Sequence, residues 1–237
     1  GTFDEGRKSI LFIHGSGGDH TVWVHQYSKL KDDFNIAAVE LPGHGSSEGK
    51  GENDVEAYVE WIRQIMEAFN IRKPYLAGHS LGAAITLSFA VSRPELISGI
   101  IPVGGGVRMP VNPAILEGLK NDPVSVVDMT VKFSIAKANR ERLSGPLRES
   151  MLKANPTVFH DDLVACDKLD VADKIPGIKL PTLVICGDDD KMTPPTLSKY
   201  IAENIGGARL SLIPGAGHFV MVENPAAFND AIKSFLA

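Results

Sequence analysis

Ser80 lies between two glycines in the stretch AGHSLGAA, residues 77–84, within a G-x-S-x-G pattern. An apolar run precedes the pattern and a helical run follows it, which predicts a strand, a tight turn and a helix in succession. On such a turn the serine hydroxyl stands at the start of a helix, where backbone N–H groups favour developing negative charge. Ser80 is therefore a candidate nucleophile; the alternative is a polar residue in a glycine-rich turn.

A serine nucleophile needs a base within hydrogen-bond reach and an acid that orients the base. His218 follows the apolar run RLSLI and the small residues 215–217, so we expect it on a loop at the carboxyl end of a strand. His79 adjoins the serine, but neighbouring residues on a sharp turn point apart. His14 and His44 lie in glycine turns, where we expect them to hydrogen-bond backbone groups rather than react. His218 is thus the candidate base.

Three acidic residues follow another apolar run, in the stretch LVICGDDDKMTPP: Asp188, Asp189 and Asp190. The end of the preceding predicted strand offers no competitor, because no Asp or Glu occurs between Glu95 and Glu117. By chain order any of the three aspartates can serve as the orienting acid. For the other two we expect turn capping or exposure to solvent.

Strand-like and helix-like segments alternate along most of the chain. The apolar runs predicted as strands are SILFIHG, NIAAVELPG, KPYLAGHS, ISGIIPVGG, PTLVICGDDD and ARLSLIPGAGH. Helical candidates lie near residues 54–69, 81–92, 195–205 and 225–236. Most of the strand-like runs are continuously apolar, as parallel strands covered on both faces are. The sequence predicts an α/β fold with a mostly parallel sheet and helices on both faces.

The segment 107–177 departs from this alternation, because it has helical spacing, prolines that bound short segments and no clear strand. We predict a helical cap inserted late in the sheet, over the carboxyl edge where ligands bind in such folds. The predicted domains are a core of residues 1–106 and 178–237 and a cap of residues 107–177. The apolar cap residues that suggest an apolar acyl or alcohol pocket are Met109, Val111, Ile115, Leu116, Val127, Met129, Phe133, Met151 and Phe159.

Composition excludes several other classes of protein. The 237 residues are 43% hydrophobic and 22% charged, with a formal net charge of −5, so neither nucleic acid nor an anionic membrane is an expected partner. No apolar stretch reaches the length of a membrane span, and no signal peptide is visible. Cys166 and Cys186 lack CxxC or Cys/His neighbours, so we predict free thiols, no metal site and a cytoplasmic location. The pattern predicts no particular oligomeric state.

Five motifs together resemble the α/β-hydrolase superfamily over nearly the whole chain: HGSGG, ELPGHGSS, GHSLG, GDDDKMTP and GAGHFVMVENP. The resemblance implies a catalytic order of serine, acid and histidine. In this family the acid usually stands three residues after the strand-ending glycine and a few residues before a proline. Carried onto Gly187 and Pro194, this position selects Asp190.

The resemblance also implies an oxyanion hole made by two backbone N–H groups. These belong to Leu81, after the nucleophile, and to Ser16, after His-Gly in the first loop, with Gly17 as the alternative. Family members usually begin with an antiparallel hairpin, whereas only about eight residues precede SILFIHG, so we expect that hairpin to be lacking or trimmed.

We therefore expect a serine hydrolase that cleaves a small to medium, largely apolar carboxylic ester through an acyl-enzyme, without metal or organic cofactor. The same triad suits hydrolysis of a carbon–carbon bond, an enol lactone or a thioester, or perhydrolysis. A ligand receptor on this fold is the alternative from another class. Arg108, just past VGGG, is a candidate ligand for a substrate carboxylate, although a solvated surface arginine is the favoured interpretation.

Overall fold

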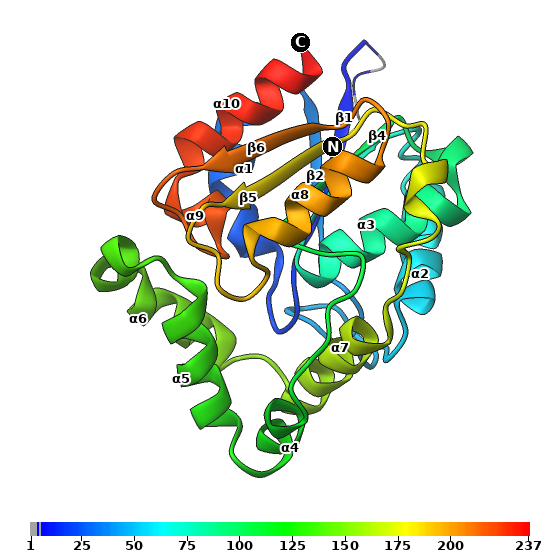
Figure 1. Cartoon of the computed structure of the whole chain (residues 1–237). Helices are drawn as coiled ribbons and strands as arrows, with labels where there is room; N and C mark the ends of the chain where they lie inside the picture. Colours follow the sequence, from blue (N-terminus) through cyan, green and yellow to red (C-terminus); the bar gives the residue numbers. More distant parts are fainter. Residues whose placement is uncertain (1–3, 5) are drawn as a thin grey trace.

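A parallel sheet runs through the part of the chain that the computed structural model describes, residue 4 and residues 6–237 (Figure 1). Its strands pair in the order β2-β1-β3-β4-β5-β6, and every pairing is parallel. The strands are β1 (Ser9–Ile13), β2 (Asn35–Val39), β3 (Tyr75–His79), β4 (Gly99–Val103), β5 (Leu183–Gly187) and β6 (Arg209–Ile213). The predicted parallel sheet is confirmed, and each strand lies inside one of the six apolar runs.

Burial explains why the inner strands are apolar throughout. Every residue of β4 and β5 is buried, since helices cover both faces of the sheet. The edge strand β6 is mostly exposed, and its Leu210 and Leu212 reach solvent. The apolar run therefore predicts more burial than β6 has, because an edge strand lacks a neighbouring strand on one side.

Two apolar layers hold helices against the sheet. One layer unites α2, α3 and α8 with the sheet, and the other unites α1, α9 and α10 with the opposite face. The bounds are α1 (Val24–Leu30), α2 (Val55–Ala68), α3 (Leu81–Ser92), α8 (Pro195–Asn204), α9 (Val220–Glu223) and α10 (Pro225–Leu236). Strand β1 contributes side chains to both layers, because successive side chains of a strand point to opposite faces. Leu11 and Ile13 pack in one layer, and Ile10 and Phe12 pack in the other.

Several helices begin with the same local signal, an Asn or Asp followed by proline. The side-chain oxygen accepts a hydrogen bond from a backbone N–H of the first turn, and the proline occupies the first helical position, where no N–H is needed. The pairs are Asn112-Pro113, Asp122-Pro123, Asn155-Pro156 and Asn224-Pro225. Three of them start helices of the predicted cap, whereas Pro146 lies inside the helix of residues 140–151.

Helices α4 (Pro113–Asn121), α5 (Pro123–Ser134), α6 (Arg140–Met151) and α7 (Pro156–Lys168) come between β4 and β5 in the chain and lie together at one end of the molecule (Figure 1). Their shared apolar cluster includes Val127, Met151 and Phe159, whereas Met129 and Phe133 are exposed. The predicted cap residues thus have different surroundings. The division into a core and a cap domain at residues 107 and 177 stays a prediction.

No helix of the described residues is long and apolar enough to cross a membrane. The expectation about an N-terminal hairpin falls partly on residues 1–3 and 5, which lie outside the described residues. The first strand that the structure describes begins at Ser9.

Candidate active site

Ser80 occupies the turn between β3 and α3 in a backbone conformation that side chains rarely adopt. Its φ is 54° and its ψ is −112°. Its N–H donates to the carbonyl oxygen of Val103 at 2.9 Å, and its own carbonyl accepts from the N–H of Ala83 at 2.8 Å. The turn is thus fixed on both sides, and Ser80 stands directly before the first residue of a twelve-residue helix.

The two glycines of the pattern permit this turn to pack tightly. A Cβ atom on Gly78 would overlap the carbonyl oxygen of Gly82, and one on Gly82 would overlap the carbonyl oxygen of Ile13. Strand β3, helix α3 and strand β1 can therefore approach each other only with glycine at both positions. The G-x-S-x-G spacing has a direct steric cause here.

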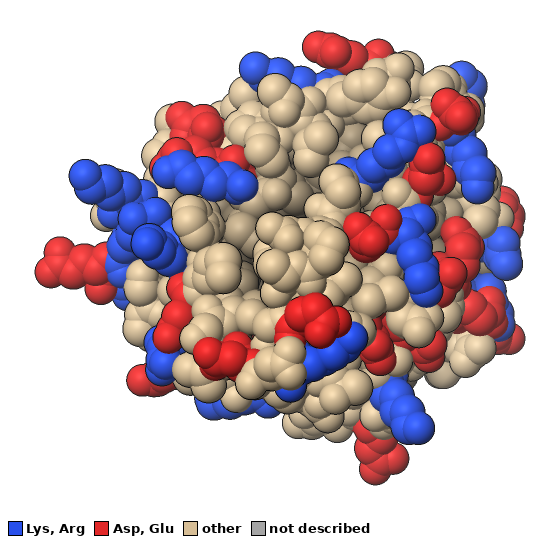
Figure 2. All heavy atoms as spheres, turned by 60° about the horizontal axis from the view of Figure 1, so that its bottom comes forward, with Lys and Arg blue, Asp and Glu red and all other residues tan. Residues whose placement is uncertain are grey.

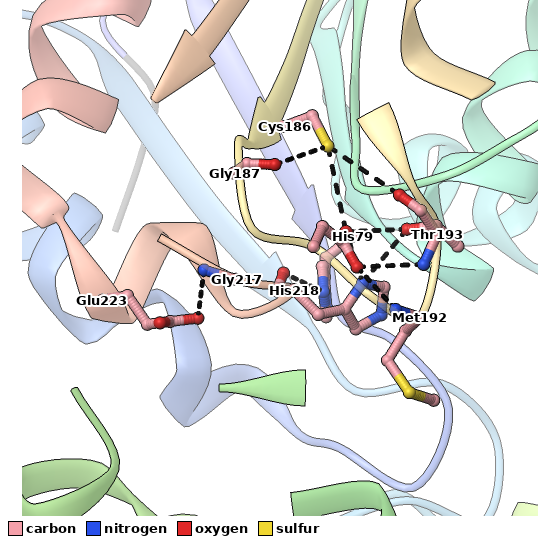
Figure 3. A network of polar contacts seen from close by, with 9 residues as sticks. His79, Cys186, Gly187, Met192, Thr193, Gly217, His218 and Glu223 are labelled. Carbon is pink, nitrogen blue, oxygen red and sulfur yellow. Dashed lines mark hydrogen bonds and ion pairs between the residues drawn. The ribbon is translucent and has the colours of Figure 1, made fainter. Parts of the chain in front are cut away.

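His218 (Figure 3) and Asp190 form a buried pair at the carboxyl ends of β6 and β5. His218 Nδ1 lies 2.9 Å from Asp190 Oδ2, and the two residues are 5% and 3% exposed. A carboxylate only accepts hydrogen bonds, so Nδ1 carries the proton and Nε2 of a neutral His218 is free to accept one. Burial raises the pKa of Asp190, but the charge of His218 and the hydrogen bonds outweigh burial and hold that pKa below its usual value.

Asp190 is held in place by the chain that follows it. Its Oδ1 accepts the N–H groups of Met192 and Thr193, both at 2.9 Å. The Thr193 hydroxyl lies 3.1 Å from His218 Nδ1 (Figure 3) and 2.9 Å from Asp190 Oδ2. The carboxylate is therefore fixed by four donors, which leaves it little freedom to turn away from the histidine.

The neighbouring aspartates have other contacts. Asp188 accepts the N–H of Gly215 at 2.8 Å, which ties the loop after β5 to the loop after β6. Asp189 faces solvent, 3.5 Å from the ammonium group of Lys191. Asp190 alone of the three contacts the ring of His218; its role as the orienting acid stays a prediction.

Ser80 and the His218–Asp190 pair meet around Gly104, the residue after β4. A Cβ atom on Gly104 would lie 3.3 Å from both Asp190 Oδ2 and His218 Nδ1. The N–H of Ser80 donates a hydrogen bond to Val103, the residue before Gly104. Among the described residues no hydrogen bond joins Ser80 Oγ to His218. Such bonds are often long in free enzymes and tighten when substrate binds.

His79 and His14 are buried and held neutral. The ring of His79 lies 4.5 Å from that of His218, centroid to centroid, and its Nε2 lies 3.0 Å from the His218 carbonyl oxygen. Burial, reinforced by His218, lowers the pKa of His79 well below its usual value. Burial likewise lowers the pKa of His14 to about 3, and its Nε2 accepts the N–H of Leu41. Both side chains contact backbone groups of loops at the carboxyl edge of the sheet.

The loop after β1 presents the remaining predicted backbone donors. Among the described residues, the N–H groups of Ser16 and Leu81 donate to no protein acceptor. The N–H of Gly17, by contrast, donates to Asp162 Oδ2 at 3.1 Å. Of the two candidates in this loop, Ser16 therefore retains an N–H available to a ligand.

Glu223, at the end of α9, links the loop of His218 to the segment after α5. Its buried carboxylate accepts the N–H group of Gly217 (Figure 3) and that of Ala136, each at 2.9 Å. The N–H of His218 itself donates to the carbonyl oxygen of Ser134 at 2.7 Å. Helix α5 is thus attached to the backbone that carries the histidine.

Sequence reasoning did not find Thr193, Glu223 or Asp162. Thr193 stands three residues after Asp190, a spacing at which a hydroxyl and a backbone N–H reach back to a carboxylate. Glu223 and Asp162 carry no local signal, because their partners come from distant segments.

Uncharged side chains surround a hollow near the centre of the face shown in Figure 2, and most charged side chains lie around its periphery. Arg108 is exposed and pairs with Asp170 at 2.9 Å, as expected for a surface arginine. Within residue 4 and residues 6–237, no group of three or more His, Cys, Asp or Glu side chains is arranged to hold a metal ion.

A parallel sheet with helices on both faces, a strained serine before a helix and a His–Asp pair at the same edge define a hydrolase of the α/β class. Residues 10–231 match the model of the alpha/beta hydrolase family, and the chain belongs to that family. Hydrolase is the enzyme class that this membership supports.

Two relatives and one further structure of the same fold are similar to this chain. A 2-hydroxy-6-oxononadienedioate/2-hydroxy-6-oxononatrienedioate hydrolase of Paraburkholderia phymatum is 25% identical, over 98% of this chain and 88% of the relative. A thermophilic esterase of known structure is 34% identical, with a TM-score of 0.84 over 99% of this chain and 91% of the esterase. The enol-lactonase of Burkholderia xenovorans LB400 is 21% identical, with a TM-score of 0.93 over 99% and 94%, which shows the shared fold.

Proposed function

We propose that this protein hydrolyses small to medium, largely apolar carboxylic esters with Ser80 as nucleophile, His218 as general base and acid, and Asp190 as the orienting acid. The observation that carries the proposal is the buried His218–Asp190 pair, 2.9 Å between Nδ1 and Oδ2, next to a serine held at a φ of 54°. A structural serine gains nothing from such a strained turn, whereas a nucleophile gains access to a carbonyl carbon.

In the proposed mechanism, His218 Nε2 takes the proton of Ser80 while Ser80 Oγ attacks the carbonyl carbon of the ester. The backbone N–H groups of Ser16 and Leu81 hold the oxyanion of the tetrahedral intermediate. The alcohol leaves with the proton from His218, and an acyl-enzyme remains. A water molecule that loses a proton to His218 then releases the acid and restores the serine.

Asp190 serves this mechanism through His218. Because Asp190 accepts from Nδ1, it fixes the tautomer in which Nε2 can take a proton, and its charge stabilises the imidazolium that forms. Four donors oppose its reorientation during the cycle.

An uncharged ester is the substrate class that we propose. The hollow in Figure 2 is bordered mainly by uncharged side chains. Arg108, the candidate ligand for a substrate carboxylate, pairs with Asp170 on the exposed surface. The 34% identity to a thermophilic esterase supports the same choice, whereas the dienedioate in the name of the P. phymatum relative describes a doubly charged substrate.

The test compares wild-type protein with Ser80→Ala on p-nitrophenyl esters of increasing chain length, an enol lactone, a thioester and a vinylogous diketone. We expect Ser80-dependent turnover that is fastest on esters, together with labelling of Ser80 by a fluorophosphonate. Near-normal turnover by Ser80→Ala contradicts the nucleophile. Faster turnover of the lactone or the diketone than of the esters contradicts an ester as the substrate class. Labelling of Ser80 with a single slow turnover favours a receptor.

A further inference from the structure

Asp162 on α7 is fully buried, and its carboxylate contacts segments that surround the loop after β1. Its Oδ2 accepts the N–H of Gly17 at 3.1 Å and lies 2.8 Å from His44 Nε2. Its Oδ1 accepts the hydroxyl of Tyr58 at 2.5 Å. A buried carboxylate costs stability unless its oxygens are satisfied, and here three donors satisfy them.

We propose that Asp162 is a positioning residue for the oxyanion hole: it holds the Gly17 N–H so that Ser16 N–H alone of this loop faces the reacting carbonyl oxygen. This inference rests on the proposed function. It assigns to helix α7 a part in transition-state stabilisation, in addition to covering the site.

The peptide plane explains how the contact acts. The Gly17 N–H belongs to the peptide group that begins at the Ser16 carbonyl, so its direction limits the rotation of the backbone about Ser16. Gly17 has a φ of 62°, a backbone conformation that favours glycine, and the Gly18 N–H closes the turn by donating to the Gly15 carbonyl oxygen at 3.1 Å. Asp162 adds a partner for the peptide group at the centre of this turn, and a donor displaced by even about 1 Å loses much of its effect on the transition state.

A second residue of α7 packs against the same glycine. A Cβ atom on Gly17 would lie 3.0 Å from the ring of Phe159, one helical turn before Asp162. Helix α7 therefore contacts this loop through both the ring of Phe159 and the carboxylate of Asp162. A shift of α7 would disturb the loop directly, so the position of α7 and the geometry of the Ser16 N–H are coupled.

His44 balances the charge of this carboxylate. Burial lowers the pKa of His44, but the hydrogen bond and the negative charge of Asp162 outweigh burial and raise that pKa. Both ring nitrogens of His44 face acceptors, Nε2 the carboxylate of Asp162 and Nδ1 the carbonyl oxygen of Pro42 at 3.1 Å, and an imidazolium donates to both. Its charge matters because an uncompensated carboxylate behind the loop would repel a developing oxyanion. The pair therefore offers an acceptor for Gly17 while limiting the negative charge near the site.

The experiment uses Asp162→Ala, Asp162→Asn and Tyr58→Phe in the full chain. Asparagine keeps an oxygen for Gly17 without the charge, and alanine removes it. Tyr58→Phe is the matched control, because it removes the contact to the other carboxylate oxygen and leaves Gly17 untouched. The readouts are kcat and KM on a p-nitrophenyl ester, melting temperature, and the affinity of an alkyl boronic acid, which forms a tetrahedral adduct with a nucleophilic serine.

We expect Asp162→Ala to lower kcat and boronic acid affinity by about ten- to a hundredfold, with KM within about twofold of wild type. Asp162→Asn should fall between alanine and wild type. Tyr58→Phe should lower the melting temperature while kcat stays at the wild-type value. If the alanine variant does not fold, a kcat loss in Asp162→Asn that Tyr58→Phe lacks supports the inference, and equal losses overturn it.

Wild-type kcat in a folded Asp162→Ala protein also overturns the inference. Failure of the proposed function is recognised separately, as wild-type protein without Ser80-dependent ester turnover. In that event the boronic acid still decides: weaker binding to Asp162→Ala than to wild type supports positioning. A boronic acid that binds both proteins equally, or neither, refutes it.

Discussion

Asp190→Asn is the substitution whose effect the structure specifies most closely. Asparagine has the same size, and its oxygen can still accept the N–H groups of Met192 and Thr193. Its amide nitrogen then replaces Oδ2 and points donors at His218 Nδ1. Because two donors cannot share a hydrogen bond, His218 moves its proton to Nε2 and can no longer accept the proton of Ser80.

The expected magnitude follows from this tautomer change. A wrong tautomer with preserved geometry lowers kcat by about 10⁴ in a serine protease triad, which corresponds to about 5.5 kcal/mol of transition-state stabilisation. The fold should tolerate the change, because two of the four hydrogen bonds to the side chain persist. The loss should therefore be large in kcat and small in melting temperature.

The adjacent aspartates provide matched controls with the same chemical change. Asp189→Asn removes an exposed ion pair worth about 0–1 kcal/mol and should leave kcat unchanged. Asp188→Asn weakens the bond to Gly215 and should cost about 1 kcal/mol of stability with little effect on kcat. Steady-state hydrolysis of p-nitrophenyl butyrate and thermal melts measure all three variants. Full activity of Asp190→Asn, or a kcat loss confined to one of its neighbours, would refute the reasoning.

Three further results are expected. Ser80→Gly relieves the positive φ and should raise the melting temperature by about 2–4 °C while activity is lost, whereas Ser80→Ala keeps its Cβ and should show no such gain. Because the pKa of His44 is raised above 6.5 in the folded state, its protonation stabilises the fold below that pH, and this contribution is lost as pH rises through the raised value. Urea melts between pH 5 and pH 9 should show this loss in wild type and a flatter profile in His44→Gln; identical profiles contradict the assignment. Glu223→Ala leaves two buried backbone N–H groups without an acceptor and should cost about 2–4 kcal/mol in urea denaturation, and a cost under about 0.5 kcal/mol argues against the link.

The parts of the site that depend on local structure could be predicted from the sequence. Two glycines between a strand and a helix predict the turn at Ser80. Small residues after an apolar run predict the loop that carries His218. Asp190 could be selected only from the position of the acid in the family. Asp188 and Asp189 follow the same strand and differ from Asp190 only in their tertiary contacts. Residue type and spacing could not separate the three.

The parts that depend on distant partners could not be predicted. Asp162 meets His44 and Gly17 across 118 and 145 positions of sequence, and no periodicity connects them. Residues of the predicted cap show the same limit, since helical spacing did not distinguish the buried Val127 from the exposed Met129. Burial in this region depends on how α4–α7 pack on one another, which the pattern of a single helix does not contain.

The chain enters and leaves the insertion that carries α4–α7 at neighbouring points, because the N–H of Val171 donates to the carbonyl oxygen of Val107 at 3.1 Å. A loop whose ends are already neighbours can change length at little entropic cost, about 0.6 kcal/mol for each doubling. Evolution or an engineer could therefore exchange this insertion for a shorter or a longer one without shifting the strands that carry the serine and the acid. The contacts that join the insertion to the core at Gly17, His218 and Glu223 would need to be rebuilt in the graft.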